Sequence, residues 1–206
     1  MITSLLSAPL KNKKGNGGVG SYKHCAPNGA ANGAVATELA RPLIFGKSRR
    51  PVANTYSQIY IQVVFAVQGR QNLIRPEHKE ELQKYMTGIV SHQGQKLIAI
   101  HCMPDHTHIL IGLKPNMALS ALVGAIKTGS TNHINEHRWV LGRFSWQEGF
   151  GAFSYSHSQL SDVIGYIQDQ AKHHARTTFQ REYLQFLKKF EIQHDERYVF
   201  MSVDGE

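Results

Sequence analysis

The chain has 206 residues, slightly more than one ordinary domain needs, and its 41% hydrophobic content is enough for a buried core. Of the net charge of +8, residues 1–52 carry +7, so the basic composition says little about nucleic-acid binding by the main body. No apolar run approaches a membrane span, and the two cysteines exclude a disulfide framework. A cytoplasmic protein without membrane contact is therefore expected.

Residues 1–52 are rich in Gly, Asn and Ala and lack helical or strand periodicity, which predicts a disordered extension before a domain at 53–206. The extension has three interpretations: a nonspecific basic arm, an organelle transit peptide, or sequence upstream of the natural start. We favour the third, with a non-Met start such as Val52, because patterned sequence begins abruptly after it. An endogenous N-terminal peptide that begins before Val52 would exclude this hypothesis.

Residues 55–67 alternate between apolar and polar side chains, which predicts a strand. The apolar positions that follow Pro76 recur with helical spacing as far as Gly94, which predicts a helix packed on the sheet. Residues 97–113 then contain two apolar runs around Met103-Pro104-Asp105, and this pattern predicts two strands joined by a tight turn.

The second strand of this hairpin begins at His106 and His108. Because side chains alternate across a strand, both imidazoles lie on one face and Thr107 lies on the other. Imidazole is a common ligand of divalent cations, so the pair is a candidate metal site. A hydrogen-bonded pair of core histidines would give the same motif, so the motif alone leaves both interpretations open.

Residues 119–135 form a second amphipathic pattern and predict a second helix on the sheet. This helix is expected to expose Lys127, Ser130 and Asn132, whose donors suit phosphate oxygens. A fourth strand is expected within 144–156, where glycines permit a bulge or a close backbone approach. The order β-α-β-β-α-β predicts an α+β, ferredoxin-like fold: an antiparallel sheet with helices on one face, plus C-terminal helices.

Ser156 and Gln159 form a capping box that opens a third helix. Tyr166, Gln170 and His173 share one stripe of this helix, so their side chains lie near one another. Such residues are usually ordinary surface groups, so spacing alone does not assign catalysis. A last helix is expected from Thr178, and residues 197–201 are expected to add a short edge strand.

From about Asn54 to Phe200 the chain resembles the tyrosine HUH transposases of small single-strand insertion sequences, a family that includes the REP-associated transposases. The resemblance rests on MPDHTHIL, the WQEGF and AFSYS stretch, and Tyr166-Ile-Gln-Asp-Gln170. It implies that His106, His108 and Gln170 bind Mg²⁺ or Mn²⁺ and that Tyr166 is the nucleophile. Thr107 stands where the family usually has a larger aliphatic residue, but it faces away from the site.

The resemblance further implies a homodimer that nicks and rejoins single-stranded DNA at hairpin-bearing element ends, through a 5′-phosphotyrosine intermediate. Two alternatives stay open. One is a domesticated family member that acts on chromosomal repeats. The other is a ferredoxin-like module that binds single-stranded nucleic acid without catalysing a reaction.

Overall fold

The structure is a computed structural model, and it describes residues 56–195 and Val199. Its strands and its α-helices of eight or more residues run as follows: β1 Ile59–Ala66, α2 Pro76–His92, β2 Lys96–Cys102, β3 His106–Leu113, α3 Leu119–Glu136, β4 Gly151–Tyr155, α4 Leu160–Gln168 and α6 Phe179–Lys189. A shorter helix, α5, spans Gln170–His174, and 3₁₀ turns occupy Gln68–Arg70 and His157–Gln159.

The four strands form one sheet in the order β2-β3-β1-β4, and every neighbouring pair is antiparallel. Each of the two β-α-β connections therefore skips one strand, which is the ferredoxin-like arrangement. The predicted fold is confirmed. Strands β3 and β1 occupy the centre, where Val64 pairs with His108.

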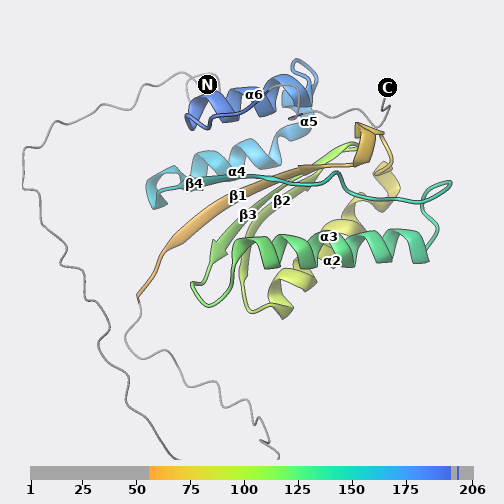
Figure 1. Ribbon diagram of the computed structural model, residues 1–206, viewed down its shortest axis with the longest axis horizontal. Coiled ribbons are helices and arrows are strands. Elements are labelled where there is room, and N and C mark those ends of the chain that lie inside the picture. Colours follow the sequence, from red (N-terminus) through yellow and green to blue (C-terminus); the bar gives the residue numbers. More distant parts are fainter. Residues whose placement is uncertain (1–55, 196–198, 200–206) are drawn as a thin grey trace, which may run out of the picture. The chain divides into compact units, whose positions relative to one another are not determined.

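Helices cover both faces of this sheet (Figure 1). Helices α2 and α3 pack on one face around Val63, Phe65, Ile109 and Ile111. On the other face, α4 and α6 pack around Val64, Leu110 and Phe153. The expected pair of helices on one face is confirmed, and the C-terminal helices prove to cover the second face.

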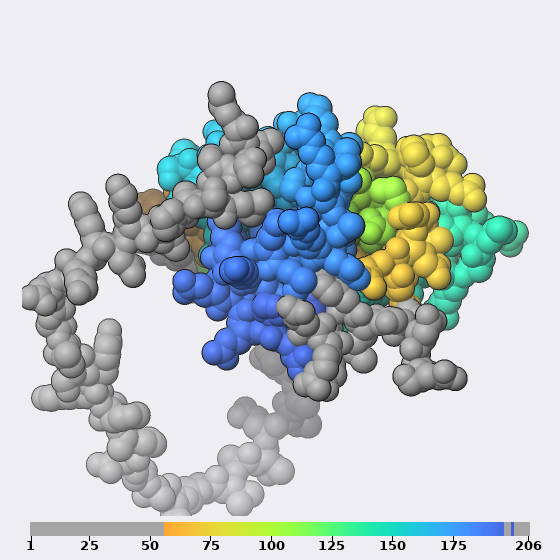
Figure 2. All heavy atoms as spheres, turned by 90° about the horizontal axis from the view of Figure 1, so that it is seen from above, coloured from red at the N-terminus to blue at the C-terminus, as the bar shows by residue number. Residues whose placement is uncertain are grey.

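Figure 2 views the molecule from the side of the C-terminal helices, whose blue atoms occupy the middle of this face. Because this cover is apolar, with Val163, Ile167 and Phe186 buried against the sheet, the central strands are withdrawn from solvent on both faces. A polar side chain on β1 or β3 must therefore find a partner inside the protein.

The fourth strand is shorter than predicted. Only Gly151–Tyr155 pairs along β1, whereas Trp146 makes one isolated bridge to Val67 and packs its ring into the opposite core. The expected close approach at a glycine is confirmed at Gly151, where an added Cβ would lie 2.8 Å from the ring of Tyr183. A side chain at this position would force the Tyr183 ring to move.

The capping box of Ser156 and Gln159 is confirmed, and the backbone N–H of Ser156 donates to Gln159 Oε1 at 2.9 Å. The helix that follows is not continuous, because it is interrupted at Asp169 (φ −89°, ψ 15°), where α4 ends and α5 begins. Ala171, the second residue of α5, is exposed.

Two sequence-based expectations, the disordered extension at 1–52 and the edge strand at 197–201, concern segments that lie outside the described residues, apart from Val199. Among the helices of residues 56–195, none is long and apolar enough to cross a lipid bilayer.

Ser130 of α3 is fully buried, which contradicts its expected exposure. Its hydroxyl donates to the carbonyl oxygen of Ile126 at 2.6 Å and accepts the indole N–H of Trp146 at 2.9 Å. We expect Ser130→Ala to leave that indole N–H unpaired and to lower the free energy of unfolding by about 1–3 kcal/mol, measured by urea denaturation.

The matched control is Thr128→Ala on the exposed side of the same helix, which should change stability by no more than about 0.5 kcal/mol. Equal effects of the two substitutions would show that the Trp146 hydrogen bond is not what makes Ser130 important.

Candidate functional site

Strand β3 brings His106 and His108 together on the face that α4 and α6 cover. Their side chains are 1% and 0% exposed, and the two ring centroids lie 5.1 Å apart. Thr107 points to the opposite face, so the predicted alternation is confirmed. Two buried imidazoles need polar partners, and the Nδ1 atom of each ring has a hydrogen-bond partner.

His106 Nδ1 lies 2.7 Å from Oδ1 of Asp105, and a carboxylate can only accept, so this nitrogen carries the proton. His108 Nδ1 lies 2.9 Å from the side-chain amide of Gln62, which also accepts a hydrogen bond from the hydroxyl of Tyr155 at 3.0 Å. Both rings are thus oriented from one side, with Nε2 left toward the C-terminal helices. Sequence reasoning gave Asp105 only a role in the turn and Gln62 only a place on the strand.

Tyr166 and Gln170 approach the histidines from the end of α4 and the start of α5. Tyr166 is 8% exposed and Gln170 is fully buried. The Tyr166 hydroxyl donates to Oε1 of Glu182, and the Gln170 amide donates to the same oxygen at 3.0 Å. The structure therefore brings together all four residues that the resemblance implied, within one chain.

Glu182 of α6 is the residue at the centre of the cluster, and the sequence analysis missed it. Its carboxylate is 1% exposed, and Oε2 lies 3.3 Å from Nε2 of His108 and 3.2 Å from Nε2 of His174. The signal in the sequence was its position: Glu182 follows Phe179 by three residues and precedes Phe186 by four, on the buried stripe of an amphipathic helix.

Burial and this carboxylate together decide the protonation states. Burial lowers the pKa of His106 to about 4, against the effect of Asp105, so its ring is neutral at pH 7. Burial and the negative charge of Glu182 raise the pKa of Tyr166 well above its usual value. Burial opposes the ionised form of Glu182 as well, but the imidazoles around it, His108 first, hold the pKa of its carboxyl well below the usual range.

Several buried polar atoms at this point have no hydrogen-bond partner: Nε2 of His106, His108 and His174, Oε1 of Gln170 and Oε2 of Glu182. Unpaired polar groups in a dry interior are costly. Lone pairs of neutral imidazole, amide oxygen and carboxylate are all ligands of divalent cations, so the donor set fits such an ion. That His106, His108 and Gln170 bind it stays a prediction.

The proposed phosphate-binding residues of α3 lie elsewhere, because this helix packs on the other face of the sheet. Asn132 is exposed, whereas Lys127 is half-buried and donates to the carbonyl oxygens of Gln147 and Gly149 at 2.5 and 2.8 Å. Ser130 is withdrawn from the set, since a buried hydroxyl with both neighbours paired cannot reach a phosphate.

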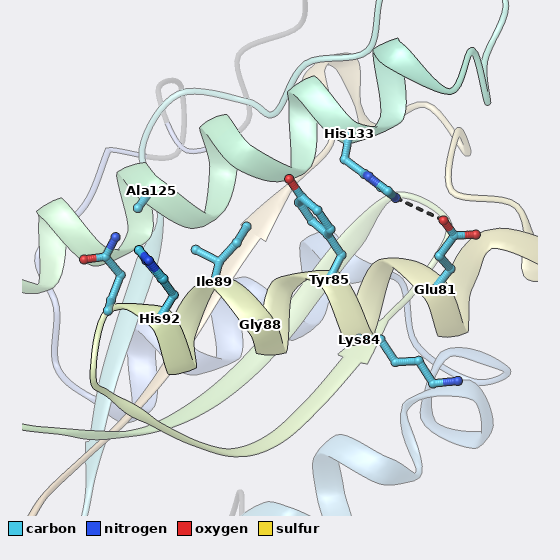
Figure 3. A pocket seen from close by; sticks show the side chains of 9 residues that line it. Glu81, Lys84, Tyr85, Gly88, Ile89, His92, Ala125 and His133 are labelled. Carbon is cyan, nitrogen blue, oxygen red and sulfur yellow. Dashed lines mark hydrogen bonds and ion pairs between the residues drawn. The ribbon is translucent and has the colours of Figure 1, made fainter.

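A second, open hollow of about 710 Å³ lies between α2 and α3 (Figure 3). Glu81 and His133 point toward each other across it, with Glu81 Oε1 and His133 Nε2 3.2 Å apart, and the ring of Tyr85 stacks on His133. This cluster, which also includes His137, is largely exposed. Glu81 and His137 are exposed, and His133, whose side chain is 11% exposed, is paired with Glu81, so no buried atom of this cluster lacks a partner.

Residues 55–170 match the sequence profile of the family described as "Transposase IS200 like". The chain is also similar to the ISDra2 transposase TnpA of Deinococcus radiodurans, with 23% identity over 120 residues that cover 55% of this chain and 84% of that protein. The family match ends at Gln170, so His174 and Glu182 lie beyond it.

Two solved structures are similar to this one. A transposase from Deinococcus radiodurans R1 shows a TM-score of 0.44 at 22% identity and covers 57% of this chain and 94% of its own. A REP-associated tyrosine transposase bound to a REP hairpin shows a TM-score of 0.46 at 16% identity, with coverage of 69% and 90%.

Proposed function

This chain belongs to the IS200-like transposases, and from that premise we propose that it nicks and rejoins single-stranded DNA through a tyrosine nucleophile and a divalent cation. The observation that carries the proposal is the convergence of the Tyr166 phenol with the unpaired Nε2 atoms of His106 and His108 and with Oε1 of Gln170. The substrate class that the family resemblance implies is single-stranded DNA with a hairpin near the cleavage site.

His106, His108 and Gln170 would hold Mg²⁺ or Mn²⁺, and a bound cation would polarise the scissile phosphate as a Lewis acid. Asp105 and Gln62 orient the two imidazoles through their Nδ1 atoms. The apolar side chains of α4 and α6 exclude water from this face of the sheet. The chain's own contribution is therefore to hold the phenol and the two imidazoles in fixed orientations in a buried site.

In the cleavage step, Tyr166 Oη would attack phosphorus, and the bond from phosphorus to the 3′-oxygen would break. The products are a 5′-phosphotyrosine and a DNA 3′-OH, and the phenol proton is balanced by the proton that the 3′-oxygen gains. A later 3′-OH attacks the same phosphotyrosine and releases the phenol, so rejoining needs no ATP. In the resting site the phenol keeps its proton and donates it in a hydrogen bond to Glu182.

We expect Tyr166→Phe to abolish a denaturation-resistant adduct between the protein and labelled hairpin DNA, because the nucleophilic oxygen is gone while the ring still packs. His106→Ala should also abolish the adduct, and Gln170→Ala should reduce it less, since water partly replaces a neutral amide ligand. Gel electrophoresis after denaturation, with Mn²⁺ or Mg²⁺ present, measures each.

Tyr85→Phe, on the other face of the sheet, is the control that should leave the adduct unchanged. An adduct formed by Tyr166→Phe would transfer the role to Tyr155 or Tyr183. If no divalent cation supports an adduct even in the wild-type protein, the chain is better explained as a non-catalytic module that binds single-stranded nucleic acid.

The homodimer that we propose can share its sites in two ways, and here α4 lies over β3 of its own chain. A mixture of the Tyr166→Phe and His106→Ala proteins should therefore form no adduct. Had the tyrosine helix been exchanged between subunits, mixed dimers would hold one intact site and about a quarter of the activity would return. Light scattering on the same mixture reports whether dimers are present.

We further propose that Lys127 and Asn132 contact the DNA backbone. Lys127→Met should weaken hairpin binding and reduce the slope of log affinity against log salt by about 1, and Asn132→Ala should weaken binding at every salt concentration. The control is Ser130→Ala, which should lower stability without changing the slope. An unchanged slope in Lys127→Met would leave that ammonium only its bonds to the 147–149 loop.

A further inference from the structure

Helix α6 brings a charged group into the candidate site from a part of the chain that the family match does not reach. Glu182 lies twelve residues beyond the end of that match at Gln170 and is 1% exposed. A buried carboxylate is retained only where it is paired or coordinates a metal. Every ion pair that Glu182 makes within the described residues is with a histidine.

The two oxygens of this carboxylate have different surroundings. Oε1 accepts hydrogen bonds from Tyr166 and Gln170. Oε2 has no hydrogen-bond partner and faces the imidazoles of His106, His108 and His174 at 4.0, 3.3 and 3.2 Å, measured to Nε2. One oxygen of the group thus pairs with the phenol and the amide, and the other faces three imidazole nitrogens.

These separations match the spacing of ligands around one cation. With metal–ligand bonds of about 2.1 Å, adjacent ligand atoms lie about 3.0–3.4 Å apart and opposite ones about 4.2 Å apart. The ligand atoms of His106, His108, His174 and Glu182 all lie within 4.8 Å of one another. The fold therefore holds four donors at coordination spacing.

We propose that Glu182 and His174 are metal ligands in this chain, so that α5 and α6 add a carboxylate and a third imidazole to the two strand histidines. The inference rests on the proposed function and deepens it. Because Mg²⁺ prefers oxygen ligands whereas nitrogen-rich sets favour transition metals, the enlarged set selects Mn²⁺ over Mg²⁺.

The alternative is an ion pair between Glu182 and a protonated His174 that merely fastens α6 to α5. Mn²⁺ titration of the full chain, by calorimetry and by the electron paramagnetic resonance signal of free Mn²⁺, separates the two. We expect Glu182→Gln and His174→Gln each to weaken Mn²⁺ binding at least about tenfold. His174→Gln, which removes a nitrogen ligand, should also reduce the preference for Mn²⁺ over competing Mg²⁺.

His173→Gln is the matched control, because His173 adjoins His174 but approaches the other carboxylate oxygen, Oε1, at 3.7 Å. It should keep Mn²⁺ affinity within about twofold. His106→Ala should abolish binding at this site. Melting curves in EDTA identify any variant that has lost its fold, and His174→Gln then still tests the inference if Glu182→Gln fails to fold.

Wild-type Mn²⁺ affinity in folded Glu182→Gln and His174→Gln, together with loss of binding in His106→Ala, would overturn this inference and leave the proposed function intact. Retained binding in His106→Ala would instead count against the strand histidines as ligands, and so against the proposed function itself.

Discussion

The constraint on which this structure depends is the burial of β3 on both faces. Its alternate side chains enter two separate cores, with Ile109 and Ile111 against α2 and α3, and His106, His108 and Leu110 against the C-terminal helices. Two imidazoles in the second core would be costly in isolation. Their presence obliges neighbouring elements to supply polar groups, and these groups make up the rest of the site.

Those groups come from four different elements, and each lies beside a particular ring nitrogen. Asp105 and Gln62 reach the Nδ1 atoms from the hairpin turn and from β1, while Gln170, His174 and Glu182 gather around the Nε2 atoms from α5 and α6. The ring of Phe179 stacks on His106 at 4.3 Å between centroids and adds an apolar contact to this cluster. The polar cluster and the apolar side chains around it therefore form one buried unit.

Much of this was predictable, because local pattern carries it. The order of elements, the shared face of the two histidines and the capping box at Ser156 all follow from periodicity and local chemistry. Periodicity failed where tertiary contacts decide: Ser130 has the polarity of a surface residue, but it is buried because it pairs with Trp146. Likewise, no local signal indicates the interruption at Asp169.

Glu182 shows a different limit of prediction from the sequence. Glu182 lies 76 residues after His106, and only the docking of α6 brings the two together. In the sequence it looks like one of many solvated glutamates, although its place between Phe179 and Phe186 puts it on the buried stripe. An ionisable residue at an apolar position of an amphipathic helix is thus a better indicator of a site than its residue type alone.

The side-chain amide of Gln62 has one more property that matters for His108. An amide carries a donor and an acceptor at nearly equal positions, and the hydroxyl of Tyr155 can pair with either. A half-turn about the last torsion of Gln62 therefore exchanges which nitrogen of His108 holds hydrogen, with no displacement of the sheet. Binding of a cation at Nε2 of His108 would therefore require rotation of only the Gln62 amide and the Tyr155 hydroxyl.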